Sequence, residues 1–306
     1  MTPFFLKPST ALKTGNRRTD ANAKWFCGAA ASGLMNLNYS VSGSNILSVA
    51  IVTFNCQRTI AGTLDSLIAN IPSGFHSRLI IVDNHSGDGT LDTLRKYAHA
   101  HEFIHLICNN ANVGFGRAHN QVLSAVESRY HAICNPDIIF SYDIFTPLME
   151  FIQNRPQIGL SCPKFLNPDG TLQPLNRRHP SVLDLFIRRF LSAALEPVFQ
   201  KRLSSYDMRD VGYDHSYDVP FVSGAFMFCR TAVLKAVGGF DERFFLYFED
   251  ADLSRKVQAL GYRTVYCPDV TVTHAWERLA HKSWLGTWIF AKSAYKYFRK
   301  WGFKLW

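Results

Sequence analysis

"ILSVAIVTF", residues 46–54, and "RLIIVDN", residues 78–84, are short apolar runs, and each gives way to polar residues at its end. Between them, "RTIAGTLDSLIANI", residues 58–71, is amphipathic and has the length of a helix. A strand, a helix and a second strand in this order predict a βαβ unit, in which the helix joins two parallel strands. The fold therefore starts as an α/β fold near residue 46.

The same alternation continues along the chain, with further apolar runs at 103–109 and 130–138 and helix-like segments between and after them. Residues 1–44 have no sustained period, which predicts a poorly ordered extension. Residues 164–218 break the rhythm with Pro, Arg and His, so they are expected to form an inserted, partner-facing segment. The order returns with "VPFVSGAFMFCR", residues 219–230, which predicts another strand.

The last residues, "SWLGTWIFAKSAYKYFRKWGFKLW" at 283–306, mix Trp, Phe and Tyr with Lys and Arg. This composition is typical of an amphipathic helix that lies in a membrane interface. A terminal helix that docks on the core and exposes a basic face has the same pattern, so both interpretations stay open.

Composition limits the possible partners without selecting one. The chain has 306 residues, a formal net charge of +9 and 47% hydrophobic residues, so a sizeable core and an anionic partner are expected. Nucleic acid, an acidic membrane surface and a phosphorylated small molecule all fit this charge. The seven cysteines have no C-x-x-C spacing, which favours reduced thiols of a cytosolic protein over a disulfide framework or a zinc site.

Polar side chains follow the first two predicted strands at the edge where ligands bind in parallel α/β sheets. Thr53 and Asn55 end the first strand, and Asp83 ends the second, just before a glycine-containing turn. A carboxylate there can accept hydrogen bonds from a nucleobase or a ribose. A turn or helix-capping aspartate is the alternative for Asp83.

Two further strand ends carry candidate ligand-binding residues. In "NNANVGFGRAHN", residues 109–120, Gly114 allows a close backbone approach and Arg117 can neutralise phosphate, although a plain helix start fits equally well. In "CNPDI", residues 134–138, Asn135 and Asp137 project on the same side of an extended chain. Their oxygens suit Mg²⁺ or Mn²⁺, and an Asx-Pro turn is the alternative.

The stretch "FFLYFEDADLSRKVQALGY", residues 244–262, predicts a helix that begins with a cluster of carboxylates. At about 100° per residue, Glu249 and Asp250 flank the apolar stripe and lean toward the protein body. Asp252 is predicted on the surface, where Arg255 and Lys256 are its expected salt-bridge partners. A carboxylate in the first helical turn is held ionised, as a general base requires, and helical phase leaves both Glu249 and Asp250 as candidates.

From about residue 46 to 276, these motifs in this order resemble the inverting glycosyltransferases of family 2. The resemblance implies a GT-A (nucleotide-diphospho-sugar transferase) fold with a Rossmann-like, mainly parallel sheet flanked by helices. It places the transferase domain at 45–276, with a nucleotide-sugar half at 45–163 and an acceptor and catalytic half at 164–276. Residues 277–306 then form the basic aromatic C-terminal helix.

The resemblance also implies roles for individual residues. Asp250 is the catalytic base, Asp137 is a metal ligand in a D-x-D-type motif, and His274 matches a further metal ligand of some members. Asn135 replaces the first Asp of that motif, so the site should hold its metal more weakly. The nucleoside is held by Thr53, Asn55 and Asp83.

Within the family, the resemblance is closest to bacterial rhamnosyltransferases of O-antigen and cell-wall polysaccharide assembly. It implies a dTDP-L-rhamnose donor, a lipid-linked or growing saccharide as acceptor, and no nucleic acid. The enzyme is then expected on the cytoplasmic face of the inner membrane. Basic residues would face a diphospholipid acceptor there, namely Arg177, Arg178, Arg188 and Arg189.

Three alternatives remain. They are a UDP-hexose-dependent family 2 enzyme, a catalytically idle nucleotide- or carbohydrate-binding protein on the same fold, and a sugar nucleotidyltransferase. The last class carries a Gly-rich basic loop after its first strand, and "VTFNCQRTIAG", residues 52–62, has no such loop.

Overall fold

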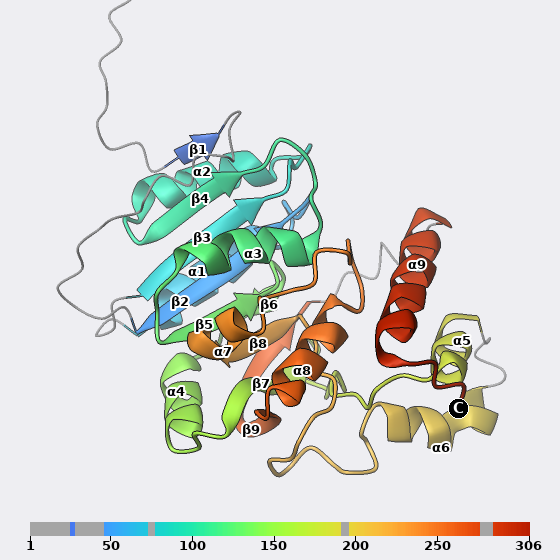
Figure 1. The fold of residues 1–306 in the computed structure, drawn as a ribbon. Coiled ribbons are helices and arrows are strands. Elements are labelled where there is room, and N and C mark those ends of the chain that lie inside the picture. Colours follow the sequence, from blue (N-terminus) through green and yellow to red (C-terminus); the bar gives the residue numbers. More distant parts are fainter. Residues whose placement is uncertain (1–24, 28–45, 73–76, 191–195, 276–283) are drawn as a thin grey trace, which may run out of the picture.

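The computed structural model describes residues 25–27, 46–72, 77–190, 196–275 and 284–306. Their centre is a nine-stranded sheet (Figure 1). Its spatial order is β1 (Trp25–Cys27), β4 (Ile104–Cys108), β3 (Ser77–Asp83), β2 (Leu47–Thr53), β5 (Tyr130–Cys134), β8 (Phe226–Arg230), β7 (Ile158–Leu166), β9 (Arg263–His274) and β6 (Ile138–Ile139).

The sheet is mixed and mostly parallel. The pairs from β1 to β5 are parallel, as is the pair of β7 with β9. The strand β8 runs antiparallel to both β5 and β7, and β6 runs antiparallel to β9. Every residue of β2 is buried, because both faces of the central sheet are covered. The expected α/β fold is confirmed.

Helices cover the sheet and extend beyond it. They are α1 (Ile60–Asn70), α2 (Thr90–Ala100), α3 (Phe115–Ala125), α4 (Phe145–Gln153), α5 (Val182–Phe190), α6 (Glu196–Tyr206), α7 (Thr231–Ala236), α8 (Glu249–Ala259) and α9 (Trp284–Trp301). In Figure 1, α3, α7 and α8 lie in front of the sheet, while α5, α6 and α9 gather to its right. Among the described helices, none is both long and apolar enough to cross a bilayer.

Strand register brings the predicted site residues to neighbouring strand ends. Thr53 pairs with Asp83 at the carboxyl ends of β2 and β3. At the other side of the sheet, Ile138 in β6 pairs with His274 in β9, and the amide of Ala275 donates to the carbonyl of Asp137 over 2.9 Å. The short strand β6 therefore fixes Asp137 beside His274.

A second hydrophobic cluster joins α5, α8 and α9 away from the main core. Its buried members are Leu185, Phe221, Phe244, Phe248, Ala251, Tyr297 and Phe298. The tail after α9 is tied to the start of α5, because the amides of Val182 and Leu183 donate to the carbonyls of Lys304 and Leu305. These contacts connect the C-terminal helix with the first turn of α8.

The expected extension at 1–44 lies mostly outside the described residues, but β1 falls within it and pairs in parallel with β4. The cysteine prediction is partly wrong. Among the described side chains, five cysteines have free thiols, and Cys108 in β4 is disulfide-bonded. The free ones are Cys56, Cys134, Cys162, Cys229 and Cys267.

Candidate active site

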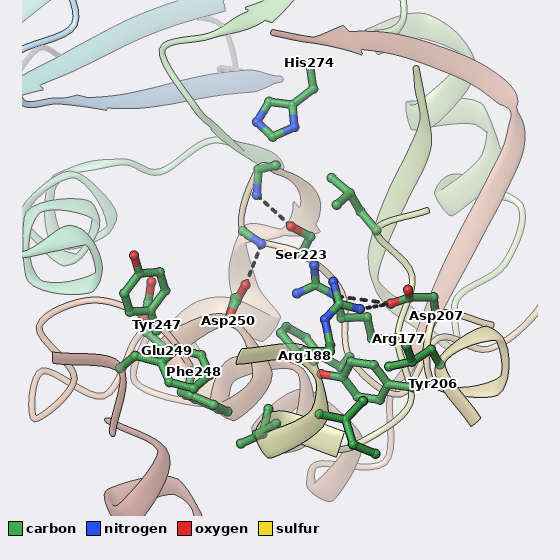
Figure 2. A pocket seen from close by; sticks show the side chains of 18 of the residues that line it. Arg177, Arg188, Tyr206, Asp207, Ser223, Tyr247, Phe248, Glu249, Asp250 and His274 are labelled. Atoms are coloured by element: carbon green, nitrogen blue, oxygen red, sulfur yellow. Dashed lines mark hydrogen bonds and ion pairs between the residues drawn. The ribbon is translucent and has the colours of Figure 1, made fainter. Parts of the chain in front are cut away.

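A cavity of about 1140 Å³ lies beside the first turn of α8. Most of its wall comes from four parts of the chain, namely residues 175–188, α6 with the residues that follow it, residues 221–225 and residues 246–250. Phe115 of α3 and Phe290 of α9 also line it. Asn135 and His274 reach it from the sheet. Figure 2 shows His274 at the top of the view, Asp250 in the middle and a group of arginines beside Asp250.

Asp250 is the carboxylate that the backbone aims into this cavity. The amide of Gly224 donates to its Oδ2 over 2.9 Å, and the amide of Ala251 donates to its Oδ1 over 2.9 Å. Burial raises the pKa of Asp250, while the Gly224 amide and the charge of Arg177 oppose that rise. The side chain is therefore oriented as an anion but is more basic than an exposed aspartate, and both properties suit a general base.

The turn before α8 is strained. Tyr247 and Phe248 have φ values of 70° and 68°, a left-handed conformation that bulky residues rarely adopt. Both residues line the cavity. Such strain is concentrated at functional sites, where packing has to maintain it.

Glu249 differs from Asp250 in its electrostatics. It is 5% exposed, and its Oε2 has no hydrogen-bond partner among the described residues. Burial, followed by the charge of Asp250, holds the pKa of Glu249 well above its usual range. When Asp250 is ionised, Glu249 keeps its proton, so this difference favours Asp250 as the base.

The predicted surface position of Asp252 is wrong. Its side chain is fully buried, and its Oδ1 accepts from Trp301 Nε1 over 2.7 Å and contacts Lys300 Nζ over 2.6 Å. Its partners therefore come from α9 and not from the predicted Arg255 and Lys256. The residue fastens the C-terminal helix to the first turn of α8.

Asp137 and His274 face each other at the other end of the cavity region. Asp137 Oδ1 lies 3.4 Å from His274 Nε2, and His274 Nδ1 lies 2.7 Å from Gln173 Oε1. Because Gln173 donates its Nε2 hydrogens to Asn167 over 2.9 Å, its oxygen faces the ring, so Nδ1 carries the proton. His274 Nε2 is therefore the ring nitrogen that faces the Asp137 carboxylate.

This arrangement fits a divalent cation. Asp137 Oδ1 is buried without a hydrogen-bond partner in the described part of the chain, and a cation beside it would offset that cost. No group of three or more His, Cys, Asp and Glu side chains with metal-binding geometry occurs in the same part. Mg²⁺ or Mn²⁺ would therefore need diphosphate oxygens and water to complete its coordination.

The predicted nucleoside residues form their own network outside the cavity wall. Asp83 is 1% exposed and accepts from Thr53 Oγ1 over 2.9 Å and from Ser86 Oγ over 2.6 Å. Asn55 Oδ1 accepts from the amide of Gly87 over 2.7 Å. The structure thus brings these residues together at one edge of the sheet. Asp83 also accepts from the amide of Ser86 over 3.0 Å, as the alternative of a turn-capping aspartate predicts.

Gly114 and Arg117, which are predicted to contact the ligand, have protein contacts in this structure. Gly114 has a φ of +90°, and a Cβ built there would lie 2.5 Å from the carbonyl oxygen of Phe245. Its close approach is therefore to the segment before α8. The exposed side chain of Arg117 pairs with Glu242 over 3.5 Å and does not line the cavity.

Sequence reasoning missed several residues of the site. The Gly224 amide that orients Asp250 lies in the "SGAFMFCR" motif, where the sequence pattern predicts only a strand. Asp207 and Gln173, which contact Arg188 and His274, lie in the irregular segment 164–218. A buried Gln or Asp within such a segment carries no periodic signal that would have identified it.

Two family models match this chain. The family model described as Glycosyl transferase family 2 matches residues 48–238, and that of Glycosyl transferase family group 2 matches residues 202–300. The chain is 27% identical over 244 residues to N-acetylglucosaminyl-diphospho-decaprenol L-rhamnosyltransferase of Mycobacterium tuberculosis, covering 76% of each protein. It is 25% identical to rhamnosyltransferase WbbL of Escherichia coli, over 53% of this chain and 60% of that protein.

Solved structures show the same fold. The mannosyltransferase of Pyrobaculum calidifontis in complex with GDP-Man and Mn²⁺ matches with a TM-score of 0.58 at 17% identity, over 85% of this chain and 64% of that one. GalNAc-T7 with UDP, GalNAc and Mn²⁺ also matches with a TM-score of 0.58, at 16% identity, over 78% of this chain and 45% of that one. With its GT-A fold and its match over most of the central domain, this chain belongs to glycosyltransferase family 2.

Proposed function

We propose that this protein is an inverting glycosyltransferase that moves L-rhamnose from dTDP-L-rhamnose to a lipid-linked or growing saccharide of a bacterial surface polysaccharide. The observation that carries the catalytic part is the carboxylate of Asp250, which is oriented into the cavity by the amides of Gly224 and Ala251. The names of the relatives from M. tuberculosis and E. coli support the choice of rhamnose.

In the proposed reaction, Asp250 takes the proton of an acceptor hydroxyl. The acceptor oxygen forms a bond to the anomeric carbon of the donor from the face opposite the diphosphate. The bond between that carbon and the diphosphate oxygen breaks, and the nucleoside diphosphate leaves with the electron pair. Displacement from the opposite face inverts the anomeric configuration, and Glu249 lines the cavity as a neutral neighbour.

Asp137 and His274 are proposed to hold Mg²⁺ or Mn²⁺, which would offset the charge of the departing diphosphate. Gln173 keeps the protonated Nδ1 of His274 turned away, so Nε2 can serve as a ligand. Asn135 lines the cavity next to this pair and is proposed to contact the donor. The nucleoside is proposed to bind at the sheet edge formed by Thr53, Asn55 and Asp83.

A donor screen tests the choice of sugar. Purified protein is incubated with dTDP-, UDP- and GDP-sugars, with and without Mn²⁺, and hydrolysis of the donor is measured. We expect turnover of dTDP-L-rhamnose. Turnover of UDP-hexoses alone would select the UDP-hexose alternative, and absence of any turnover with intact nucleotide binding would favour an idle binding protein.

The Asp250→Asn variant tests the base. We expect it to bind dTDP as the parent does, while its transfer rate falls by a factor of about 10²–10⁴, the usual contribution of general base catalysis. Glu249→Gln is the matched control, because it removes the adjacent carboxyl group and leaves Asp250 in place. A near-normal rate for Asp250→Asn would remove this residue from the base role.

We also propose that α9 and the tail after it contact an anionic membrane surface on the cytoplasmic side. Trp284, Trp288 and Trp306 are 84%, 61% and 77% exposed, and Lys292 and Arg299 are exposed on the same helix. Exposed tryptophans next to basic side chains suit the headgroup region of a bilayer. The protein should cosediment with phosphatidylglycerol vesicles, and Trp284→Ser with Trp288→Ser should weaken this binding. Equal binding of parent and variant would contradict the proposal.

A further inference from the structure

Two arginines enter the cavity with one carboxylate between them. Arg188 Nη1 forms an ion pair with Asp207 Oδ1, and Arg177 Nε lies 3.9 Å from the same oxygen. Figure 2 shows both guanidinium groups converging on Asp207 beside Asp250. Asp207 and Asp250 oppose these two guanidinium groups, and Lys201 and Arg209, which also line the cavity, leave its wall with an excess of positive charge.

Packing holds both guanidinium groups in place. Arg177 lies over the ring of Phe221 at 5.5 Å, and Arg188 lies over the ring of Tyr206 at 5.4 Å. The backbones of Arg177 and Phe221 are also hydrogen-bonded in both directions, over 3.2 and 2.9 Å. The Nε atom of Arg177 is buried without a hydrogen-bond partner among the described residues. These groups are therefore oriented in advance for an anion.

We propose that Arg177 and Arg188 form a subsite for the phosphate or diphosphate group of an amphiphilic acceptor. This inference rests on the proposed glycosyl transfer and names the acceptor class for that site. Arg177 is near enough to lower the pKa of Asp250 against the effect of burial. A phosphate at the arginines would hold the attached sugar with a hydroxyl at Asp250.

The cavity wall next to the arginines suits an apolar chain. Leu185 and Ile187 of α5 and Phe290 of α9 line it, and Phe186 on α5 is 53% exposed. Both helices also expose aromatic side chains, namely Phe186 on α5 and Trp284 and Trp288 on α9. A lipid attached to the phosphate would therefore pass from the cavity along α5 and α9.

The donor diphosphate is proposed to bind at a different place from the two arginines. The pair Asp137 and His274 fits a cation with diphosphate. Figure 2 shows His274 at the top of the view, away from the two arginines. Of the four arginines predicted to face the acceptor, Arg177 and Arg188 line the cavity, and the side chain of Arg189 lies outside the described part of the chain. Arg178 turns away to Asp210 and the hydroxyl of Ser205, over 2.8 and 2.9 Å, and is left out of the subsite.

The test compares binding of three probes to the full chain by isothermal titration calorimetry. The probes are farnesyl diphosphate, inorganic diphosphate and dTDP. We expect Arg177→Gln and Arg188→Gln each to weaken farnesyl diphosphate binding at least tenfold, with dTDP binding unchanged. Arg263→Gln is the control, because this arginine pairs with Asp218 outside the cavity. Its loss should alter neither farnesyl diphosphate binding nor dTDP binding.

Each outcome separates this inference from the proposed function. If farnesyl diphosphate binds equally to the parent and both variants, the acceptor subsite is wrong, even when donor hydrolysis continues. If dTDP binding weakens as much, the arginines belong to the donor site and the inference is overturned. Tighter binding of farnesyl diphosphate than of inorganic diphosphate supports a lipid-linked phosphate, whereas equal binding would overturn the amphiphilic part.

Asp207→Asn provides a second test that retains both arginines. This carboxylate competes with a bound anion for the guanidinium groups. Its neutralisation should tighten farnesyl diphosphate binding several-fold, most clearly at low salt, where charge interactions are least screened. Weaker binding by a folded Asp207→Asn protein would overturn the assignment of the arginines.

Discussion

Asp252→Asn should loosen the C-terminal helix and destabilise the protein. Asp252 Oδ1 contacts Lys300 Nζ over 2.6 Å and Trp301 Nε1 over 2.7 Å, and its side chain is fully buried. The neutral amide can still accept from Trp301 through its oxygen. It can no longer neutralise the ammonium group of Lys300.

The size of the effect depends on the ion pair and the solvent contact that Lys300 keeps. Loss of one partner from a buried ion pair costs about 3–5 kcal/mol. Lys300 retains Asp241 at 2.8 Å, and its side chain is 25% exposed, so water and the second carboxylate compensate for part of the loss. We therefore expect the free energy of unfolding to fall by about 2 kcal/mol, which corresponds to a decrease in Tm of about 4 °C.

The assay is a double-mutant cycle measured by urea unfolding. Asp252→Asn, Lys300→Met and the double variant are compared with the parent, and the double variant should lose about 1 kcal/mol less than the sum of the single variants. Asp218→Asn is the control, because Asp218 has an exposed ion pair with Arg263 and its loss should cost less than about 0.5 kcal/mol. Additive losses, or an Asp252→Asn protein as stable as the control, would refute the proposed linkage.

Three other changes test separate parts of the fold and site. Gly114→Ala places a Cβ 2.5 Å from the carbonyl oxygen of Phe245, so both Tm and kcat should fall. Gly170→Ala is the control and should lower them less, because its φ is also positive (+81°) but no atom lies within 4 Å of the added Cβ. Because burial raises the pKa of Asp250, kcat/KM should fall with decreasing pH at a pH above the usual aspartate range, and an acid limb near pH ~4 would contradict this. Burial lowers the pKa of His131 to about 4. The folded state therefore binds fewer protons than the unfolded state below pH ~6.5, so stability should fall as the pH decreases from there toward 4, and thermal melts of His131→Gln should show a smaller decline.

The alternation of apolar runs and helical segments was enough to predict the parallel half of the sheet. It works there because strands buried on both faces are continuous apolar runs, as in β2 and β3. It did not predict that β8 would lie antiparallel between β5 and β7. A buried strand has the same composition whichever direction its neighbours run, so pairing depends on tertiary contacts.

Strand ends were also a useful guide to the candidate site. They predict Asp137, and the family resemblance adds His274. These two residues are far apart in sequence and are brought within 3.4 Å by the pairing of β6 with β9. Helical phase failed for Asp252 because it relates each side chain to the apolar stripe of its own helix. The face opposite that stripe is covered by α9, and no property of residues 249–259 indicates that covering helix.

The two interpretations of the C-terminal helix are compatible because they concern opposite faces of it. On the inner face, Phe290 and Tyr297 contact the ring of Phe248, one of the two strained residues before α8. Left-handed backbone at Tyr247 and Phe248 costs on the order of 1–3 kcal/mol per residue, and burial of aromatic rings is large enough to offset it. The outer face keeps its exposed aromatic side chains available for a membrane. A membrane that binds this outer face would therefore hold the helix that supports the turn into Asp250. The proposed base would then lie next to the proposed acceptor as it arrives from the lipid.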